Sequence, residues 1–308
     1  MGYHPRIETS EYSCLLTTRS RNSELWFVNN QTLENAILGY AAKYSTHYSV
    51  KLYALAIEGN HIQGVAHFPN MNRAAFMRDL NSTTAKAVAR YTPEYPGGRF
   101  WGRRYSSEFL PRNEDIERYF FYTVLQAVQD GLVDKISDYP GYNCFHDAAW
   151  GIKRKFKVIE WARYNSSRRR NKNIKLSNFT KIVELKYERL PGYEHLSQKE
   201  YANMLTAKLE HYRNLIIQER NKKDKGFTGR EKLLKAKRGA KPKNTKTSTI
   251  NCFRPRVLCS CPITRQQALN WYFAIYERFK RCSEKYRNGE LLTEFPPGTY
   301  KPFLSSFA

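Results

Sequence analysis

Negative charge, long apolar runs and paired cysteines are all scarce in this sequence. Asp and Glu number 28 against 52 Lys and Arg, so the formal net charge is +24 over 308 residues. No apolar run reaches the about 18 residues that a membrane helix needs, and no charged segment followed by an apolar one opens the chain as a secretion signal would. We therefore expect a soluble, cytoplasmic protein with no membrane partner.

The six cysteines lack the spacing of a disulfide framework or of a zinc ribbon. Cys252, Cys259 and Cys261 form a loose cluster that could hold zinc with a fourth ligand, although free or half-buried thiols are the commoner outcome for such a cluster. We expect reduced cysteines and no structural metal.

Positive charge is what the sequence has in excess. A net charge of +24 and a pI near 9.8 exceed what solubility requires. A polyanion is the first partner to expect, because a cationic surface gains binding free energy by displacing counterions from phosphates. An anionic membrane surface would also attract such a charge, but no apolar segment supports that interpretation.

The N-terminal half alternates between the period of strands and that of helices. Two β-rich runs, residues 51–57 and 61–68, are joined by Glu-Gly-Asn, a turn composition that predicts a hairpin. We expect, in order, strand, helix, hairpin, helix, strand or loop, and helix, over residues 11–18, 31–45, 51–68, 72–91, 99–110 and 114–129. This order predicts an α+β fold, a ferredoxin-like antiparallel sheet with helices packed on one side, in a domain of residues 1–150.

The second half, residues 151–308, is expected to be basic, mainly helical and able to bind nucleic acid. Residues 198–220 place Tyr201, Leu205 and Leu209 on one helical face, and residues 264–287 carry a second helical pattern. Between these helices, a segment around residues 222–248 is dense in Lys, Arg and Gly. Such a composition predicts a flexible arm that can become ordered on a nucleic acid.

The hairpin contains the stretch EGNHIQGVAHF, residues 58–68, with His61 and Gln63 two positions apart. Residues two apart on a strand share a face, where an imidazole nitrogen and an amide oxygen can bind one divalent ion. Alone, such a pair is more often solvated or hydrogen-bonded than metal-binding. His67 lies about 20 Å further along the strand at about 3.3 Å per residue. We therefore expect His67 to be structural or exposed.

Tyr122 and Gln126 lie four residues apart in the predicted helix that contains YFFYTVLQ, residues 119–126. This spacing places them on one helical face. If the helix crosses the face of the hairpin, the tyrosine could serve as a nucleophile and the carboxamide as a third metal ligand. Packing into the core is the alternative for a tyrosine in so aromatic a helix.

Several stretches within about residues 10–145 resemble the REP-associated tyrosine transposases, a bacterial branch of the single-tyrosine HUH transposase and nuclease superfamily. The hairpin stretch, FWGRRY at residues 100–105, the helix with Tyr122, GLV at 131–133 and DYPGYN at 138–143 follow that family's order and spacing. The resemblance implies a bacterial, cytoplasmic and nucleoid-associated protein that acts on hairpins formed by palindromic repeats in single-stranded DNA. It favours a monomer over a homodimer.

Carried onto this sequence, the resemblance implies that Tyr122 is the nucleophile and that His61, Gln63 and Gln126 hold Mg²⁺ or Mn²⁺. Gln63 stands where the family has a second histidine, and Gln126-Ala127 where it has Asn-Pro. Replication initiators of small circular-DNA viruses resemble the same fold and also use His-hydrophobic-Gln. The implied activity is metal-dependent nicking and strand transfer through a 5′-phosphotyrosine. The alternative is a catalytically inactive descendant that binds DNA or RNA hairpins.

The chemistry requires these residue types. A phenol with a pKa of about 10 is a weak nucleophile at neutral pH, so a metal ion must polarise the phosphate that it attacks. A ligand set rich in carboxamides suits Mg²⁺ or Mn²⁺ better than zinc. A rolling-circle replication initiator would share this chemistry but usually carries a helicase domain, and no Gly-x4-Gly-Lys-[Ser/Thr] motif occurs.

Basic residues interleaved with aromatic ones are the expected DNA contacts. Guanidinium groups suit phosphates, and aromatic rings suit unstacked bases. We expect contacts from Arg99, Trp101, Arg103, Arg104, Tyr105, Arg168, Arg169 and Arg170. Taken singly, each of the first five is explained equally well as part of an aromatic strand with solvated arginines. The run Arg168 to Arg170 is of a kind that is usually a solvated face, but the net charge of +24 favours phosphate contact there.

Overall fold

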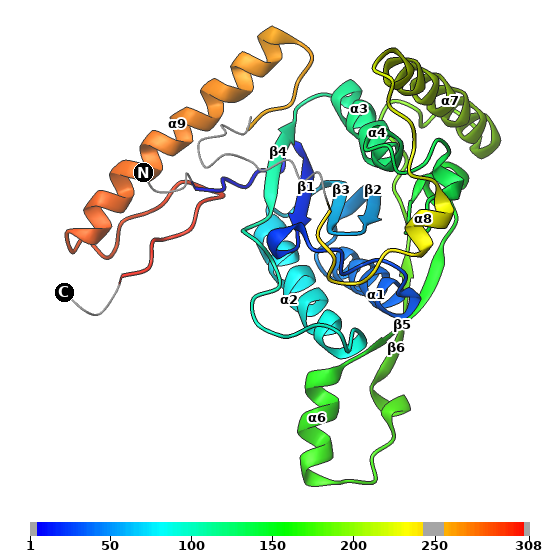
Figure 1. The fold of residues 1–308 in the computed structure, drawn as a ribbon. Coiled ribbons are helices and arrows are strands. Elements are labelled where there is room, and N and C mark those ends of the chain that lie inside the picture. The colour runs from blue at the N-terminus through cyan, green and yellow to red at the C-terminus, as the bar shows by residue number, and fades with distance from the viewer. Residues whose placement is uncertain (1–4, 243–255, 305–308) are drawn as a thin grey trace.

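A four-stranded antiparallel sheet forms the centre of the computed structural model, which describes residues 5–242 and 256–304 (Figure 1). The strands are β1 (Ser13–Arg19), β2 (Lys51–Glu58), β3 (His61–His67) and β4 (Ser106–Leu110), in the order β2-β3-β1-β4. Between them come the helices α1 (Gln31–His47) and α2 (Arg73–Tyr91). The succession βαββαβ with this strand order confirms the predicted α+β, ferredoxin-like fold.

Helices cover both faces of the sheet, so the expectation of helices on one side is wrong. Nearly every residue of β2 and β3 is buried, which requires cover on both faces. The pair α1 and α2 lies on one side, while α3 (Asn113–Val124) and α4 (Gln126–Gln129) lie on the other (Figure 1). The two short helices replace the single predicted helix, because Leu125 leaves helical geometry at φ −94° and ψ 6°.

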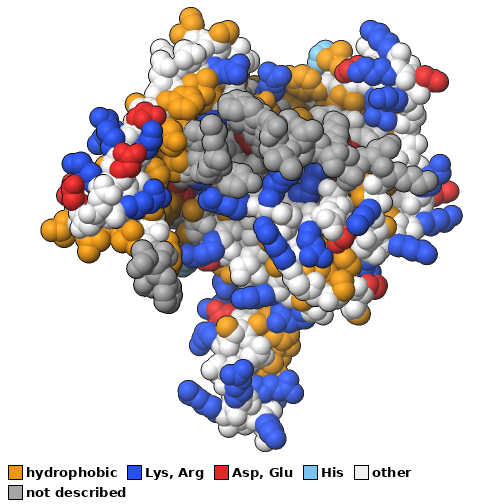
Figure 2. Space-filling model, turned by 60° about the vertical axis from the view of Figure 1, so that its left-hand side comes forward, with side chains coloured by type: hydrophobic (Ala, Val, Ile, Leu, Met, Phe, Trp, Pro, Cys, Tyr) orange, Lys and Arg blue, Asp and Glu red, His pale blue; other side chains and the backbone are white. Residues whose placement is uncertain are grey.

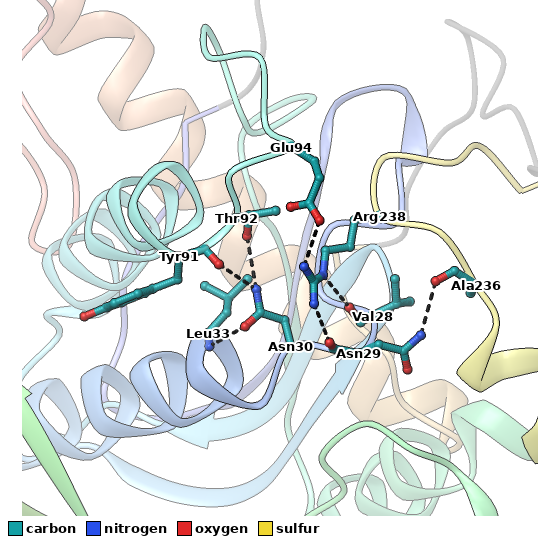
Figure 3. A network of polar contacts seen from close by, with 9 residues as sticks. All are labelled: Val28, Asn29, Asn30, Leu33, Tyr91, Thr92, Glu94, Ala236 and Arg238. Atoms are coloured by element: carbon teal, nitrogen blue, oxygen red, sulfur yellow. Dashed lines mark hydrogen bonds and ion pairs between the residues drawn. The ribbon is translucent and has the colours of Figure 1, made fainter.

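Turn and cap residues define the elements that carry the candidate site. Gly59 and Asn60 form the turn between β2 and β3, so that Glu58 pairs with His61 across the hairpin. Asn30 caps α1 by accepting a hydrogen bond from the Leu33 amide at 3.0 Å, and its own amide donates to the Tyr91 carbonyl at 2.9 Å (Figure 3). This cap joins the start of α1 to the end of α2.

The remaining elements of the described chain are helices and one long hairpin. The helices are α5 (Phe145–Trp150), α6 (Trp161–Arg170), α7 (Gln198–Lys222), α8 (Arg230–Leu234) and α9 (Pro262–Arg287), with short 3-10 turns at η1 (Arg21–Ser23), η2 (Ile136–Asp138) and η3 (Leu176–Phe179). The strands β5 (Arg154–Ile159) and β6 (Thr180–Leu185) form a two-stranded sheet that the sequence did not predict. This sheet packs on α1, where a Cβ on Gly39 would come within 2.8 Å of the Val158 side chain.

One hydrophobic core extends across the predicted boundary near residue 150. The helix α7 begins with a capping box between Ser197 and Glu200, and it buries Tyr201, Leu205 and Leu209 against the N-terminal half, as its sequence pattern predicts. The same cluster of buried residues contains side chains from all four strands of the central sheet. Part of the C-terminal half, α7 in particular, is therefore packed against the first 150 residues.

Residues 223–242, which contain α8, cross the domain as a segment that we call the strap. At one end, the Thr228 and Gly229 amides donate to the carbonyls of Gly131 and Leu132, each at 2.9 Å. At the other, the Leu25 amide donates to the Ala240 carbonyl at 2.9 Å. The segment predicted to be a flexible arm thus has defined contacts on both sides, because its backbone finds partners in the N-terminal half. Residues 243–248 of that prediction lie outside the described residues.

Side chains reinforce the second anchor of the strap. Arg238 forms an ion pair with Glu94 at 2.9 Å and donates to the Asn29 carbonyl at 2.6 Å, while the Asn29 amide donates to the Ala236 carbonyl at 3.2 Å (Figure 3). Gly239 lies against the Trp26 ring, where a Cβ would come within 2.7 Å. The strap is therefore held at two separate places.

Two further expectations concern cysteines and membranes. Cys14, Cys144, Cys259, Cys261 and Cys282 are free, and Cys252 lies outside the described residues. In the part of the chain that the structure describes, no helix combines the length and apolar character needed to span a bilayer.

Candidate active site

A cavity of about 2220 Å³ lies beside the ends of β1 and β3, and it contains most of the predicted site. Its lining includes His61 from β3, Tyr122 from α3 and Gln126 from α4. Arg19 from β1 and Glu58 from β2, the two strand neighbours of His61, also line it. The fold thus brings together side chains from five elements that are far apart in the sequence.

His61 presents one unpaired nitrogen. The side chain is 3% exposed, and its Nδ1 lies 2.8 Å from the Asn60 Oδ1, an oxygen that can only accept a hydrogen bond. This contact assigns the proton to Nδ1 and leaves a lone pair on Nε2, which is buried with no hydrogen-bond partner among the described residues. Burial, assisted by the positive charge of Arg19, lowers the pKa of His61 to about 3, so the imidazole is neutral.

Gln126 presents an unpaired oxygen to the same cavity. Its side-chain amide donates to Asp130 Oδ2 at 3.3 Å, which directs its Oε1 away from that carboxylate. In the described residues this Oε1 is buried and has no partner. A buried nitrogen lone pair and a buried carboxamide oxygen in one cavity are donors that a divalent cation would satisfy. The residues present therefore fit the Mg²⁺ or Mn²⁺ that the sequence analysis implies.

Tyr122 is half-exposed and protonated at neutral pH. Its side chain is 37% exposed, and its ring packs edge-on against Tyr119 at 5.7 Å. Burial and the negative charge of Asp130 raise the pKa of the phenol, while Arg19 acts in the opposite direction. Reaction through this oxygen requires a group that accepts its proton and a positive charge on the phosphate that it attacks.

Gln63 shares the strand face of His61 but is held by α3. The side chain is 3% exposed, and its amide nitrogen donates to Thr123 Oγ1 at 3.2 Å. Thr123 directly follows Tyr122, so this hydrogen bond ties the hairpin to the tyrosine helix. His61 lines the cavity, whereas Gln63 is not among the described residues that do so.

Glu58 is a functional candidate that sequence reasoning missed. It is 4% exposed and pairs directly with His61 in the β2–β3 ladder. Burial, with the nearby charge of Asp130, raises the pKa of its carboxyl group to about 8. The signal was present in the sequence, since a two-residue turn at Gly59 and Asn60 places residues 58 and 61 opposite each other. A carboxylate there would add a third donor type beside the imidazole and the carboxamide.

The comparison with protein families matches residues 7–120 to the model described as "Transposase IS200 like". This match covers 114 of the 308 residues, and we call residues 7–120 the IS200-like domain for this similarity. The matched segment includes His61 and Gln63 and ends two residues before Tyr122. The candidate roles of Tyr122 and Gln126 are therefore supported by the geometry of the cavity and not by the family match.

Two solved structures show weaker similarity to the chain. A REP-associated tyrosine transposase bound to a REP hairpin is 18% identical over 47% of this chain and 84% of its own, with a TM-score of 0.39. The tRNA(His) guanylyltransferase from Saccharomyces cerevisiae is 12% identical over 42% of this chain and 64% of its own, with a TM-score of 0.31. No curated protein matches the chain. Similarities this weak say nothing about activity.

The predicted DNA-binding residues of the IS200-like domain divide into exposed arginines and packed rings. Arg103 and Arg104 are exposed and line the cavity, and the exposed Arg99 donates to the Trp101 carbonyl at 3.0 Å. The Trp101 indole donates to the Asn81 carbonyl at 2.9 Å, and its ring packs against Phe100 and Phe27. The Tyr105 ring is buried under the Arg6 guanidinium at 3.8 Å. In this arrangement the two rings stabilise the fold.

Arg168, Arg169 and Arg170 lie elsewhere. They form the last turn of α6 at the end of a projection built from β5, α6, η3 and β6, which we call the arm. The arm points away from the IS200-like domain (Figure 1), and none of its described residues lines the cavity. Any contact between these arginines and DNA is therefore separate from the cavity.

The structure builds no metal site from the usual acidic and sulfur ligands. Across residues 5–242 and 256–304, no three His, Cys, Asp or Glu side chains form a group that could hold a metal ion. A metal at the IS200-like domain would therefore depend on carboxamide oxygens together with His61, a donor set suited to Mg²⁺ or Mn²⁺.

Proposed function

We propose that this protein nicks and rejoins single-stranded DNA at hairpin-forming palindromic repeats, with Tyr122 as the nucleophile. One observation carries the proposal: the Tyr122 phenol shares a cavity with two buried atoms, His61 Nε2 and Gln126 Oε1. Both atoms could ligate a metal ion, and neither has a hydrogen-bond partner among the described residues. The match of residues 7–120 to the IS200-like transposase model supports the same chemistry.

A divalent metal ion completes the proposed site. When bound, Mg²⁺ or Mn²⁺ would polarise the scissile phosphate and balance the negative charge that develops on it. His61 and Gln126 would hold the ion, and Gln63 and Glu58 lie on the same strand face of the hairpin. Asn60 orients His61 through its Nδ1, as partners of metal-binding imidazoles commonly do.

The reaction conserves the energy of the phosphodiester bond. Tyr122 Oη forms a bond to phosphorus and releases its proton to water, the bond from phosphorus to the 3′ oxygen of the preceding nucleotide breaks, and that oxygen takes up a proton. That oxygen leaves as a 3′-OH, so the products are a 5′-phosphotyrosine and a free 3′ end. Attack by another 3′-OH reverses these steps and joins a new strand without ATP. Arg19 lines the cavity beside His61. Its positive charge would stabilise the negative charge on the phosphate and on the Tyr122 oxygen as it loses its proton.

DNA binding is proposed to use two basic surfaces. Arg103 and Arg104 line the cavity and would contact the phosphates of the reacting strand, with Arg99 nearby. Arg168, Arg169 and Arg170 on the arm would contact the backbone of the hairpin stem. We infer that the protein acts as a monomer associated with the bacterial nucleoid.

Covalent capture tests the nucleophile. The protein is mixed with a labelled DNA hairpin that carries a single-stranded flank, in the presence of Mn²⁺, and adducts are resolved by denaturing electrophoresis. Wild type should form a protein–DNA adduct that Tyr122→Phe loses. Tyr119→Phe, one turn earlier on α3, is the matched control and should retain it. An adduct that survives in Tyr122→Phe would disprove the assignment.

Thermal denaturation tests the metal ligands without any catalysis. A ligand that binds only the folded state raises its stability, so Mn²⁺ should raise the melting temperature of wild type and of Tyr122→Phe. His61→Ala and Gln126→Ala should lose this increase, whereas His67→Ala, at the far end of the same strand, should keep it. An equal effect of Mn²⁺ on all four variants would exclude the proposed ligands.

A catalytically inactive hairpin-binding protein is the second candidate. It is favoured by Gln63, which replaces the usual histidine and donates to Thr123. For this candidate we expect hairpin binding that weakens steeply with salt, no covalent adduct, and no effect of Tyr122→Phe on affinity.

A further inference from the structure

The cavity has a second wall that lies outside the matched residues 7–120. It comes from the end of α7 and from the strap, and its lining residues include Arg220, Lys223, Lys225, Arg230 and Leu233. None of these belongs to the segment that defines the IS200-like domain. The site that surrounds Tyr122 is therefore composite, with one wall from each half of the chain.

Contacts with the N-terminal half hold the second wall in place. Arg220 donates to the Gln129 carbonyl at 3.2 Å, and its guanidinium lies against Gly131, where a Cβ would come within 1.9 Å. Gly131 has φ +73°, so both its backbone and its missing side chain favour this arrangement. Arg230 donates to the Asp138 carbonyl at 3.2 Å. These contacts join α7 and the strap to the chain that follows α4. The helix α4 itself carries Gln126.

The second wall is strongly cationic. Its charged members are Arg220, Lys223, Lys225 and Arg230 against a single carboxylate, Glu219, which is paired with Lys223. The first wall adds Arg19, Arg21, Arg103 and Arg104, against the carboxyl groups of Glu34, Glu58 and Asp130. Basic side chains thus line the cavity on both sides, an arrangement suited to a phosphate backbone.

The size of the cavity favours a ligand larger than a small anion. At about 2220 Å³ it exceeds the about 300–1,000 Å³ of pockets that enclose small molecules. It is also bounded by a strap whose two ends are anchored, at Gly131 and Leu132 and again at Leu25. A cavity with these walls suits a narrow, flexible chain that carries many negative charges.

We propose that the strap and the end of α7 form a binding site for the single-stranded DNA that reaches Tyr122, with Lys225 and Arg230 contacting its phosphates. This inference rests on the proposed function, since it names the element that holds the reacting strand. The strand lies between the strap and the IS200-like domain, while the stem of the hairpin remains outside.

A charge-matched pair of double variants tests the site, both in the Tyr122→Phe background so that no DNA is cut. In Lys225→Ala/Arg230→Ala, both changed residues line the cavity. In Lys232→Ala/Lys235→Ala, the two changed residues are exposed on the same strap and are not among the described lining residues. Fluorescence anisotropy measures the affinity of each variant for a hairpin with a single-stranded flank and for the same hairpin with a blunt end, over a range of salt concentrations.

The lining variant should bind the flanked hairpin about tenfold more weakly at low salt, and its slope of log K against log salt should fall by about 1.4, that is, about 0.7 for each lost single-strand phosphate contact. Its affinity for the blunt hairpin should be unchanged, and the exposed variant should match the parent on both DNAs. Thermal denaturation confirms that each variant is folded.

Three results would overturn the inference. The strap assignment falls if the lining variant binds the flanked hairpin as tightly as the parent, or if both double variants lose affinity equally, which would be a general charge effect. If the Tyr122→Phe parent binds neither DNA, the proposed function falls, and the strap assignment falls with it.

Discussion

Burial keeps two neighbouring side chains at the cavity uncharged near neutral pH. His61 has a pKa of about 3 and Glu58 a pKa of about 8, so both are neutral at pH 7 in the metal-free protein. A neutral imidazole keeps its lone pair available for a cation, while a protonated carboxyl group has to lose its proton before it can serve as a ligand. The two residues that face each other across the hairpin therefore respond to pH in different ways.

Glu58 is expected to make the metal-free protein less stable as pH rises. Its carboxyl pKa is raised on folding, so its contribution to stability is complete below the unfolded value of about 4.5 and is lost as pH rises toward 8. The free energy of unfolding of Glu58→Gln, relative to that of wild type, should rise by on the order of 1 kcal/mol for each pH unit between pH 5 and pH 8. Urea denaturation in EDTA at several pH values measures this difference.

The control for this prediction is Glu277→Gln, an exposed change on α9. Its stability relative to wild type should not vary with pH. The proposed protonation of Glu58 is wrong if the difference between Glu58→Gln and wild type stays constant from pH 5 to pH 8.

The arm is a strongly basic element of the fold. From Arg154 to Leu185 it has ten Lys and Arg residues and only two carboxylates, Glu160 and Glu184. Glu160 is paired with Arg163 at 2.7 Å and with Lys181 at 3.0 Å. The helix α6 buries none of its residues, so packing does not explain its sequence. Its exposed cations are suited to a polyanion (Figure 2 shows the blue side chains on the lower projection).

Shortening the arm should weaken binding to the hairpin stem and leave the fold intact. The Glu160 amide donates to the Phe179 carbonyl at 2.8 Å, so an Asn-Gly turn can replace residues 161–178 between them. The change removes six cations and the contact of Trp161 with Arg90 at 3.9 Å. Affinity for a blunt hairpin should fall about tenfold or more at low salt, with a shallower salt dependence.

The matched comparison for the shortened arm is Lys225→Ala/Arg230→Ala. The arm variant should lose affinity for the stem, whereas the strap variant should lose affinity for the single-stranded flank. Unchanged binding of the blunt hairpin by the shortened protein would rule out the arm as a stem-binding element.

At the scale of the whole molecule, the two halves share their core. Tyr201, Leu205 and Leu209 of α7 are each at most 4% exposed, and α7 packs on α4 and α5. The strap and the end of α7 also supply one wall of the cavity. The C-terminal half thus contributes to both the stability and the site of the N-terminal one.

A fragment that ends at residue 150 is therefore expected to be much less stable than the full chain. Each of the three α7 side chains contributes about 1.5–3 kcal/mol by burial, and the fragment would expose the surfaces that they cover. Denaturant unfolding followed by circular dichroism should show a broad or absent transition. Cooperative unfolding of the fragment at the midpoint of the full chain would instead support residues 1–150 as an independent domain.

The amino-acid sequence by itself determined the local periodicities. The two β-rich runs at residues 51–57 and 61–68 and the turn composition between them are enough to predict the hairpin, because a two-residue turn at Gly59 and Asn60 sets which residues pair next to it. The sequence likewise predicted a helix around Tyr122, although the structure ends α3 at Val124 and places Gln126 at the start of α4. These features depend on residues close together in the chain.

The tertiary structure alone decided which distant residues meet. The burial of Glu58, the cover on both faces of the sheet and the docking of the strap all depend on partners far away in sequence, such as Leu25 with Ala240. Composition predicted that the strap is flexible. The prediction missed its docking, because backbone hydrogen bonds to the N-terminal half leave no trace in local hydrophobic periodicity. Local pattern thus specified the hairpin and the tyrosine helix, and long-range packing assembled them into a cavity with two walls.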